Sequence, residues 1–213
     1  MDGPAGAGKS TVAKRLAQRL GFRYLDTGAM YRALTVKAIR LGLNLADEAA
    51  LADLLRRMRI ELRHDGATLR VLADGEDVTQ AIRDPSVTNQ VFYAARSPSV
   101  REIMVVLQRE HAAGKNIVAE GRDMTTVVFP DAEKKFYLDA SVEERARRRM
   151  KELAEAQRAI PFEQILADIK ARDEKDMTRS VAPLRRADDA IYVDTSRMTI
   201  DEVVDRLLRE IDG

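Results

Sequence analysis

The sequence predicts an α/β fold in which a mainly parallel sheet is flanked by helices and carries a small antiparallel β insert and a helical lid. Three observations predict this fold class. Short apolar runs alternate along the 213 residues with segments of helical periodicity, which is typical of parallel sheets. A glycine-rich loop at Gly3–Ser10 leads directly into a helical pattern. The segment Ile60–Thr79 instead shows strand-like alternation around two Asp-Gly turns.

The expected elements follow one another in a regular order. Apolar residues at helical spacing predict a helix over Thr11–Leu20, closed by Gly21 as a C-terminal cap. Further strands are expected at Phe22–Asp26, Asn116–Ala119, Lys135–Leu138 and Ile191–Val193, and further helices at Ala29–Leu41, Val100–Ala113, after Ser141 and over Thr199–Ile211. The last helix starts with the capping-box pattern Thr199-Ile-Asp-Glu202.

Composition narrows the classes of function. The 36 basic and 35 acidic side chains leave a net charge of +1, which does not suggest nucleic acid as the main partner. The chain has no cysteine, which excludes disulfides, thiolate metal sites and cysteine nucleophiles and is compatible with a reducing compartment. Because no membrane span or secretion signal is recognisable, we expect a cytoplasmic protein without a membrane partner.

The glycine-rich loop carries the strongest chemical signal. Gly3-Pro-Ala-Gly-Ala-Gly8-Lys9-Ser10 fits the pattern G-x-x-x-x-G-K-[ST] completely and opens a helix, as in P-loop NTPases. Glycines let successive backbone N–H groups point at a polyphosphate, and the helix N-terminus adds its positive end. Lys9 is expected to reach the β- and γ-phosphates, and the Ser10 hydroxyl suits Mg²⁺. The alternative is a turn that only caps a helix. The predicted ATP-binding residues are Gly3, Pro4, Ala5, Gly6, Ala7, Gly8, Lys9, Ser10 and Thr11.

One feature departs from this pattern. A hydrophobic strand is expected immediately before the loop, but only Met1 and Asp2 precede Gly3, so the first strand is missing from the sequence pattern. Either the start is truncated or another segment fills the gap. An absent central strand would leave neighbouring strands without hydrogen-bond partners.

Arginines suggest which kind of P-loop protein this is. Transfer of phosphate between two anionic nucleotides needs a second anion site, and guanidinium groups bind phosphate in a bidentate manner. Each candidate is expected beside a strand end, a turn or a compact polar motif; these are Arg32, Arg101, Arg122, Arg172 and Arg179.

Several motifs together resemble bacterial cytidylate kinases. Besides the loop, they are Asp26-Thr-Gly-Ala-Met-Tyr-Arg32, Gly75-Glu-Asp-Val78, Glu120-Gly-Arg-Asp-Met124, Val127-Val-Phe-Pro-Asp131, and Arg172-Asp173 with Asp176, Arg179 and Val181-Ala-Pro-Leu184. They occur in the family's order over nearly the whole chain. The resemblance implies a P-loop core at 1–30, 104–146 and 163–213, a CMP-binding region at 31–103 with the insert at about 58–80, and a lid at 147–162.

The resemblance also implies roles for single residues. It implies transfer of the γ-phosphate of ATP to CMP or dCMP, with Mg²⁺ as cofactor. Nothing in the sequence requires more than a monomer. By resemblance Thr27, Arg32, Arg122 and Arg179 hold the CMP phosphate, Arg172 and Asp176 contact the sugar, and Arg101 and Asp123 read the base. Lys9, Arg122, Arg148, Arg149 and Arg179 are the predicted catalytic residues. A carboxylate facing the N4 amino group of cytosine agrees with this, because uracil presents a carbonyl there.

Some assignments keep two interpretations. Phe92 stands where the family commonly has a small hydroxyl residue, and it either stacks on the base or packs in the core. Glu120 either orders magnesium-bound waters or caps a turn. The basic run Arg145–Lys151 is either a solvated helix face or, as in the family, the start of a lid over ATP, where Arg145 is a third candidate.

Two other functions compete with this interpretation. A kinase acting on AMP, UMP or shikimate would keep the loop and lid, but Arg101, Asp123 and the insert argue against it. A regulatory nucleotide-binding module would leave the acceptor arginines without a purpose. ADP release that depends on an acceptor distinguishes these cases.

Overall fold

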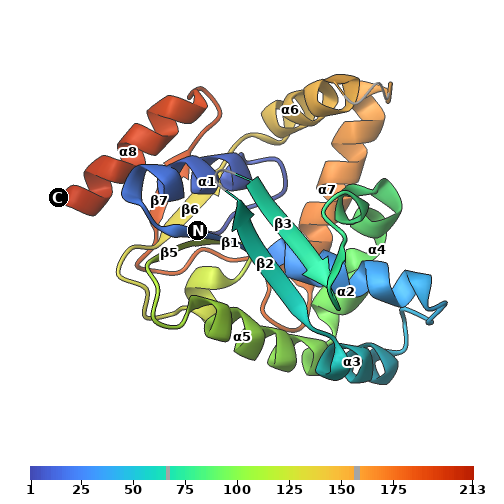
Figure 1. The fold of residues 1–213 in the computed structure, drawn as a ribbon. Helices are drawn as coiled ribbons and strands as arrows, with labels where there is room; N and C mark the ends of the chain where they lie inside the picture. Colours follow the sequence, from blue (N-terminus) through green and yellow to red (C-terminus); the bar gives the residue numbers. More distant parts are fainter. Residues whose placement is uncertain (66–67, 156–158) are drawn as a thin grey trace. The chain divides into compact units, whose positions relative to one another are not determined.

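The computed structural model describes residues 1–65, 68–155 and 159–213, shown in Figure 1. The chain divides into two compact units. Unit 1 comprises Met1–Leu20 and Glu120–Gly213, and unit 2 comprises Gly21–Ala119. The loop that matches the phosphate-binding pattern therefore shares a unit with the second half of the chain.

Unit 1 contains a short parallel sheet with helices. Its elements are α1 (Lys9–Leu20), the last residue of β5 (Ile117–Glu120), the π-helical turn η2 (Met124–Val128), β6 (Phe136–Asp139), α6 (Val142–Glu155), α7 (Phe162–Thr178), β7 (Ile191–Asp194) and α8 (Ile200–Asp212). Strand β6 pairs in parallel with β7, from Phe136 opposite Ile191 to Asp139 opposite Asp194. Helices α1 and α8 lie side by side (Figure 1) and are joined by the ion pair Arg15–Asp201. The predicted parallel arrangement of these strands is confirmed.

The two residues before the loop bond to strands of unit 1. The N–H of Asp2 donates to Phe136 O at 2.9 Å, and the N–H of Leu138 donates to Asp2 O at 2.8 Å, so Asp2 forms an isolated parallel bridge with β6. On the other side, the N–H of Gly121, which follows β5, donates to Met1 O at 3.0 Å. Met1 and Asp2 thus hold the start of the loop by hydrogen bonds to β6 and to the residue after β5.

Gly3 follows this bridge at a position where there is no room for a side chain. Its φ of 145° is accessible to glycine, and a Cβ built there would overlap the carbonyl oxygen of Leu138. We therefore expect Gly3→Ala to lower the free energy of unfolding by at least about 2 kcal/mol, measured by urea denaturation. Gly21→Ala is the matched control, because Gly21 also has positive φ but a Cβ would meet no atom within 4 Å, so its cost is limited to about 1 kcal/mol. Equal losses in the two variants would contradict the steric explanation.

Unit 2 holds the antiparallel insert among helices. Its elements are β1 (Arg23–Asp26), α2 (Thr27–Arg40), α3 (Glu48–Arg57), β2 (Ile60–Asp65), β3 (Thr68–Ala73), β4 (Glu76–Asp77), the 3-10 turn η1 (Ala81–Arg83), α4 (Pro85–Arg96), α5 (Pro98–Ala112) and the first residues of β5. The order β2-β3-β4 is antiparallel throughout, and β1 neighbours β5. The predicted meander is confirmed. Asp74 (φ 51°) and Gly75 (φ 82°) make its second turn, whereas Gly66 of the first turn lies outside the described residues.

Some elements were not predicted, and one helix begins earlier than expected. Helices α3, α4 and α7 were not predicted. The helix expected from Ala29 begins at Thr27, directly after β1, because the Asp26 carboxylate accepts the N–H of Ala29 at 2.8 Å and caps the helix there. The capping box at Thr199 and Glu202 was predicted correctly. Residues 156–158 of the predicted lid lie outside the described part of the chain.

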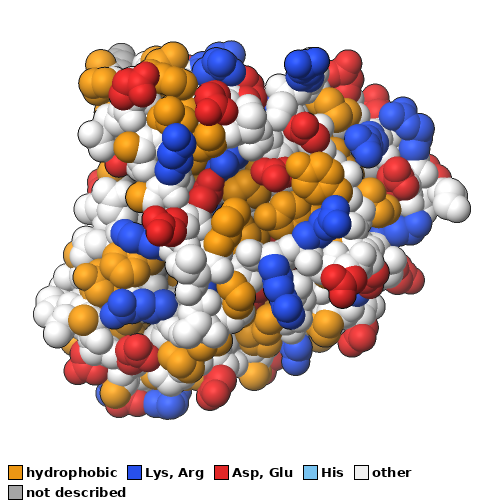
Figure 2. All heavy atoms as spheres, turned by 180° about the vertical axis from the view of Figure 1, so that it is seen from behind, with side chains coloured by type: hydrophobic (Ala, Val, Ile, Leu, Met, Phe, Trp, Pro, Cys, Tyr) orange, Lys and Arg blue, Asp and Glu red, His pale blue; other side chains and the backbone are white. Residues whose placement is uncertain are grey.

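The surface is rich in charge of both signs. On the face drawn in Figure 2, Lys and Arg side chains are interspersed with Asp and Glu, in keeping with the net charge of +1.

Within residues 1–65, 68–155 and 159–213, none of the helices has the length and apolar character needed to span a bilayer. The buried core of unit 1 includes Leu16, Leu138, Val193 and Leu207, which anchor α1, β6, β7 and α8 to one another.

Candidate active site

The phosphate loop is a closed turn at the start of α1. Gly6 and Gly8 have φ of 78° and 85°, a conformation that costs side-chain-bearing residues free energy. A Cβ on Gly6 would lie 3.1 Å from the Cβ of Arg145, so the loop is also closely covered by α6. These constraints fix the backbone N–H groups that the sequence pattern assigns to phosphate binding.

Lys9 folds back onto its own loop. Its Nζ donates to Pro4 O at 2.7 Å, and the residue is only 5% exposed. Burial, followed by the positive charge of Arg122, lowers the pKa of Lys9 to about 7, although Glu120 opposes the shift. A lysine held in this way gains a strong partner when a polyanion enters the loop.

Ser10 and Glu120 form a pair of hard oxygen donors beside the loop. The Ser10 hydroxyl donates to Glu120 Oε1 at 2.7 Å, and Glu120 is 6% exposed at the end of β5. A hydroxyl and a carboxylate are ligand types that Mg²⁺ accepts, with phosphate oxygens and waters completing its shell. Among the described residues there is no group of three or more His, Cys, Asp or Glu that could hold a metal by itself. The pair therefore suits a Mg²⁺ ion that binds together with the phosphates of a nucleotide.

Arg122 and Asp176 make a half-buried ion pair in unit 1, with each side chain 19% exposed. Arg122 Nε donates to Asp176 Oδ2 at 2.8 Å. Burial alone would lower the pKa of Arg122 and raise that of Asp176, but their mutual attraction outweighs burial and shifts both values the other way. Arg172, on α7, also acts electrostatically on Asp176 and on Lys9. Both side chains of the pair are thus charged before any substrate binds.

Arg179 and Asp123 form the second pair of opposite charges. Arg179 Nη2 lies 3.7 Å from Asp123 Oδ1, and their side chains are 8% and 5% exposed. Arg179 Nε also donates to Ala182 O at 2.6 Å. Asp123 occupies the N-cap position of η2 but makes no side-chain capping bond there. The carboxylate predicted to read the base therefore does not cap the turn that follows it.

Unit 1 brings seven of the predicted residues into one electrostatic network. The members linked by the interactions above are Lys9, Glu120, Arg122, Asp123, Arg172, Asp176 and Arg179. Arg32, Arg101 and Arg172 lie within helices α2, α5 and α7. The first two fall in segments for which the sequence already predicted helices, and a helix face can present an arginine as firmly as a turn does.

The other predicted acceptor residues belong to unit 2. Thr27 is 2% exposed at the first position of α2, and Arg32 on the same helix lies 3.4 Å from Asp26. Arg101 is 3% exposed and donates to Tyr31 Oη at 3.3 Å and to Ala95 O at 3.4 Å. These two hydrogen bonds hold the Arg101 guanidinium in the interior of unit 2.

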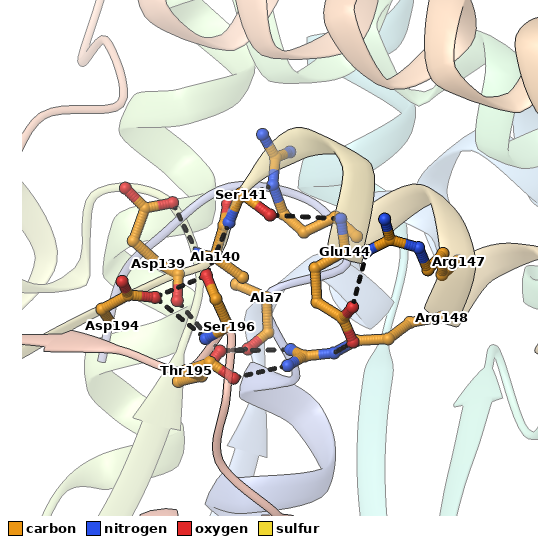
Figure 3. Close-up of polar contacts among 11 residues, drawn as sticks. Ala7, Asp139, Ala140, Ser141, Glu144, Arg147, Arg148, Asp194, Thr195 and Ser196 are labelled. Atoms are coloured by element: carbon orange, nitrogen blue, oxygen red, sulfur yellow. Dashed lines mark hydrogen bonds and ion pairs between the residues drawn. The ribbon is translucent and has the colours of Figure 1, made fainter.

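The lid arginines differ from one another. Figure 3 shows Arg148 pointing from α6 to the segment after β7, where Nη2 donates to Thr195 O at 2.6 Å and Nη1 to Thr195 Oγ1 at 3.1 Å. Thr195 in turn donates to Ala7 O in the loop at 3.3 Å. Arg149 instead pairs with Glu152 on the surface of the same helix at 3.0 Å. Arg148 therefore lies beside the loop, whereas the Arg149 side chain is 42% exposed on the surface of α6.

Three residues in this region were missed as site components or left as secondary candidates. Arg145 is 6% exposed and donates to Ala140 O, to Ala5 O of the loop and, at 2.6 Å, to Asp173 Oδ2 on α7. Asp2 and Thr195 touch the site's backbone rather than its ligands. Only the position of Asp2, directly before the loop, was a usable sequence signal.

A complete phosphate loop with a covered lysine, a Ser–Glu oxygen pair and a group of arginines in one unit defines a P-loop phosphotransferase. The family model for cytidylate kinase matches residues 1–213. The chain therefore belongs to the cytidylate kinase family.

Curated relatives agree with the family match. A cytidylate kinase from Caldanaerobacter subterraneus subsp. tengcongensis is 50% identical over 99% of this chain and 92% of its own length. Those from Desulforamulus reducens and Pelotomaculum thermopropionicum are 51% and 50% identical, over 98% and 99% of this chain and 93% and 94% of theirs. The similarity thus spans both units.

Proposed function

We propose that this protein transfers the γ-phosphate of ATP to CMP or dCMP, giving ADP and CDP or dCDP. The observation that carries the proposal is the network in unit 1, where a polyphosphate loop shares charged neighbours with the arginines and carboxylates expected at a nucleoside monophosphate. Relatives that share half of its residues are named cytidylate kinases, which supports the same acceptor.

The donor half of the reaction follows from the loop. The backbone N–H groups of Gly3–Ser10 surround the β- and γ-phosphates, and Lys9 exchanges its bond to Pro4 O for a phosphate oxygen. A bound Mg²⁺ would be held by Ser10, with Glu120 reached through water, and would supply charge neutralisation at the β- and γ-phosphate oxygens. The loop amides and Lys9 thereby stabilise the negative charge that develops on the ADP leaving group.

The acceptor half needs positioning more than proton transfer. An oxygen of the CMP phosphate attacks the γ-phosphorus while the bond to the β–γ bridging oxygen breaks, and that oxygen leaves with ADP. The attacking oxygen is already anionic, so no general base is required. Arg122 and Arg179, with Thr27 and Arg32, hold the acceptor phosphate in our proposal; Arg172 and Asp176 hold the sugar, and Arg101 and Asp123 read cytosine. Arg148 and Arg149 are proposed to meet the transferred group.

The test is ADP formation from ATP and Mg²⁺ with CMP, dCMP, UMP, AMP, shikimate or no acceptor. We expect strong stimulation by CMP and dCMP and little by the others. Equal ADP release with and without acceptors would support a nucleotide-hydrolysing module instead, and preference for AMP, UMP or shikimate would replace the acceptor. Circular dichroism on the same sample shows whether an inactive preparation is folded.

Lys9 gives the donor site a pH dependence. Because the pKa of Lys9 is about 7 in the ligand-free protein, much of it is neutral at about pH 8. Bound polyphosphate raises that pKa, so ATP binding should take up a proton, and ATP affinity should fall as pH rises above about 7. Calorimetry in two buffers of different ionisation enthalpy measures the uptake.

Lys9→Arg is the matched control for this measurement. A guanidinium stays protonated at all relevant pH values, so its ATP binding should show less proton uptake than the wild-type protein. Equal proton uptake by both proteins would contradict the role assigned to Lys9. Any protonation of ATP itself contributes equally to the proton uptake of both proteins. It therefore cancels when the uptake of Lys9→Arg is subtracted from that of the wild-type protein.

We further propose that the protein works as a cytoplasmic monomer. The absence of cysteine is compatible with a reducing compartment. Every residue in the proposed reaction belongs to one chain, so a second copy adds nothing to the chemistry. Sedimentation in the presence of ATP and CMP tests the monomer.

A further inference from the structure

We infer that Asp2 is a positioning residue for the acceptor site: its carboxylate caps the η2 turn in place of Asp123, so that the Asp123 carboxylate is not held as the cap of that turn and can select the base. The inference rests on the proposed function and adds a residue to it. Asp2 is 0% exposed, so its side chain serves the interior of unit 1 and not solvent.

Three hydrogen bonds tie the Asp2 carboxylate to the first residues of η2. Oδ1 accepts the N–H of Met124 at 2.8 Å, and Oδ2 accepts both the N–H and the hydroxyl of Thr125 at 2.7 Å. The first amides of a helical turn lack partners within the turn and are ordinarily capped by the residue just before it. Here a carboxylate about 120 positions away in the sequence provides those bonds.

This arrangement changes what Asp123 can do. Aspartate is among the preferred N-cap residues, because its side chain reaches the amides of the following turn. Asp123 occupies that position with φ −148° and ψ 23°, yet it makes no capping bond, and its Oδ1 lies 3.7 Å from Arg179. Since Asp2 already satisfies the amides of Met124 and Thr125, the Asp123 carboxylate is not drawn back onto its own backbone.

Asp2 is itself held rigidly. Its N–H and its carbonyl both bond to β6, at Phe136 O and Leu138 N, so its backbone is fixed as firmly as that of a strand residue. The next residue, Gly3, opens the phosphate loop. One short segment thus supports the donor loop through its backbone and the acceptor-reading turn through its side chain. Since π-helical turns often occur at functional sites, a turn with an external cap agrees with this role.

Charge-neutral Asn at position 2 is the first test. Asp2→Asn keeps one acceptor oxygen but places an amide NH₂ group, which is a donor, opposite an N–H of Met124 or Thr125, so that one of these hydrogen bonds is lost. The ratio of kcat/KM for CMP to kcat/KM for UMP, at saturating ATP and Mg²⁺, should fall by about tenfold, because the turn can then recruit the Asp123 carboxylate as its cap. A general loss of stability, or a changed electrostatic field at Lys9, would lower kcat/KM for CMP and for UMP by the same factor and leave their ratio unchanged.

Thr125 supplies the matched pair of variants. Thr125→Val removes only the hydroxyl bond and should lower the CMP to UMP ratio less than Asp2→Asn does, whereas Thr125→Ser retains the hydroxyl and should keep the wild-type ratio. In the double variant the losses of Asp2→Asn and Thr125→Val should not add, since both break the same contact.

The outcomes separate this inference from the proposed function. A wild-type protein that does not use CMP contradicts the function itself. If the wild-type protein uses CMP and Asp2→Asn keeps the wild-type ratio while its far-UV circular dichroism is unchanged, the positioning role is wrong. A fall in the ratio for Asp2→Asn with Thr125→Ser unaffected supports it.

Discussion

Lys9→Ala should lower kcat for CMP phosphorylation by at least about a thousandfold. Lys9 is the loop side chain that we expect to neutralise the negative charge that develops on the β–γ bridging oxygen of ATP. The methyl group also leaves a space where Nζ met Pro4 O, but the loop backbone keeps its own support from β6. Steady-state ADP formation with saturating ATP and CMP measures the effect.

The control for this variant is Lys115→Ala, since Lys115 is exposed beyond the end of α5 and its Nζ donates to His111 O on the last turn of that helix. It should retain wild-type kcat. A Lys9→Ala protein with a near-normal rate and an unchanged melting temperature would refute the assignment of Gly3–Ser10 as the phosphate cradle.

Asp123→Asn should shift the base preference from cytosine towards uracil. In the proposed site the carboxylate accepts from the N4 amino group of cytosine, whereas an amide can donate to the O4 carbonyl of uracil. A mismatched buried polar pair costs about 1–3 kcal/mol, so the ratio of kcat/KM for CMP to that for UMP should fall by roughly tenfold to a hundredfold. Asp123→Ala should lose most CMP activity and gain no preference for UMP, with ATP affinity largely retained.

Asp123 also pairs with Arg179, and this second role must be separated from base reading. Asp188→Ala, on the exposed segment before β7, is the control for a lost carboxylate and should leave the ratio unchanged. If Asp123→Asn lowers kcat/KM for both acceptors by the same factor, Asp123 acts through Arg179 and does not read the base.

Local patterns determined much of the donor side. The phosphate loop, its helix, the capping box at Thr199 and the antiparallel insert depend on residues close together in the sequence, and each was predicted with small errors at the ends. Helices α3, α4 and α7 were missed, although Asp47, Asp84 and Pro85 mark where two of them begin. The residues proposed to bind the acceptor nucleotide come from the resemblance to the family motifs, because residue spacing alone does not reveal them.

Only tertiary structure decided how the site is supported. A loop can be recognised because its glycines and lysine must be neighbours in sequence to surround one phosphate chain. Hydrogen bonds between distant segments leave no such record: Asp2 on Thr125, Arg145 on Ala5 and Arg148 on Thr195 each join residues that are far apart along the chain. The sequence by itself thus determined which phosphate chemistry the protein carries, whereas the fold decided which side chains cap, cover and orient it, because burial and direction arise only when those segments pack together.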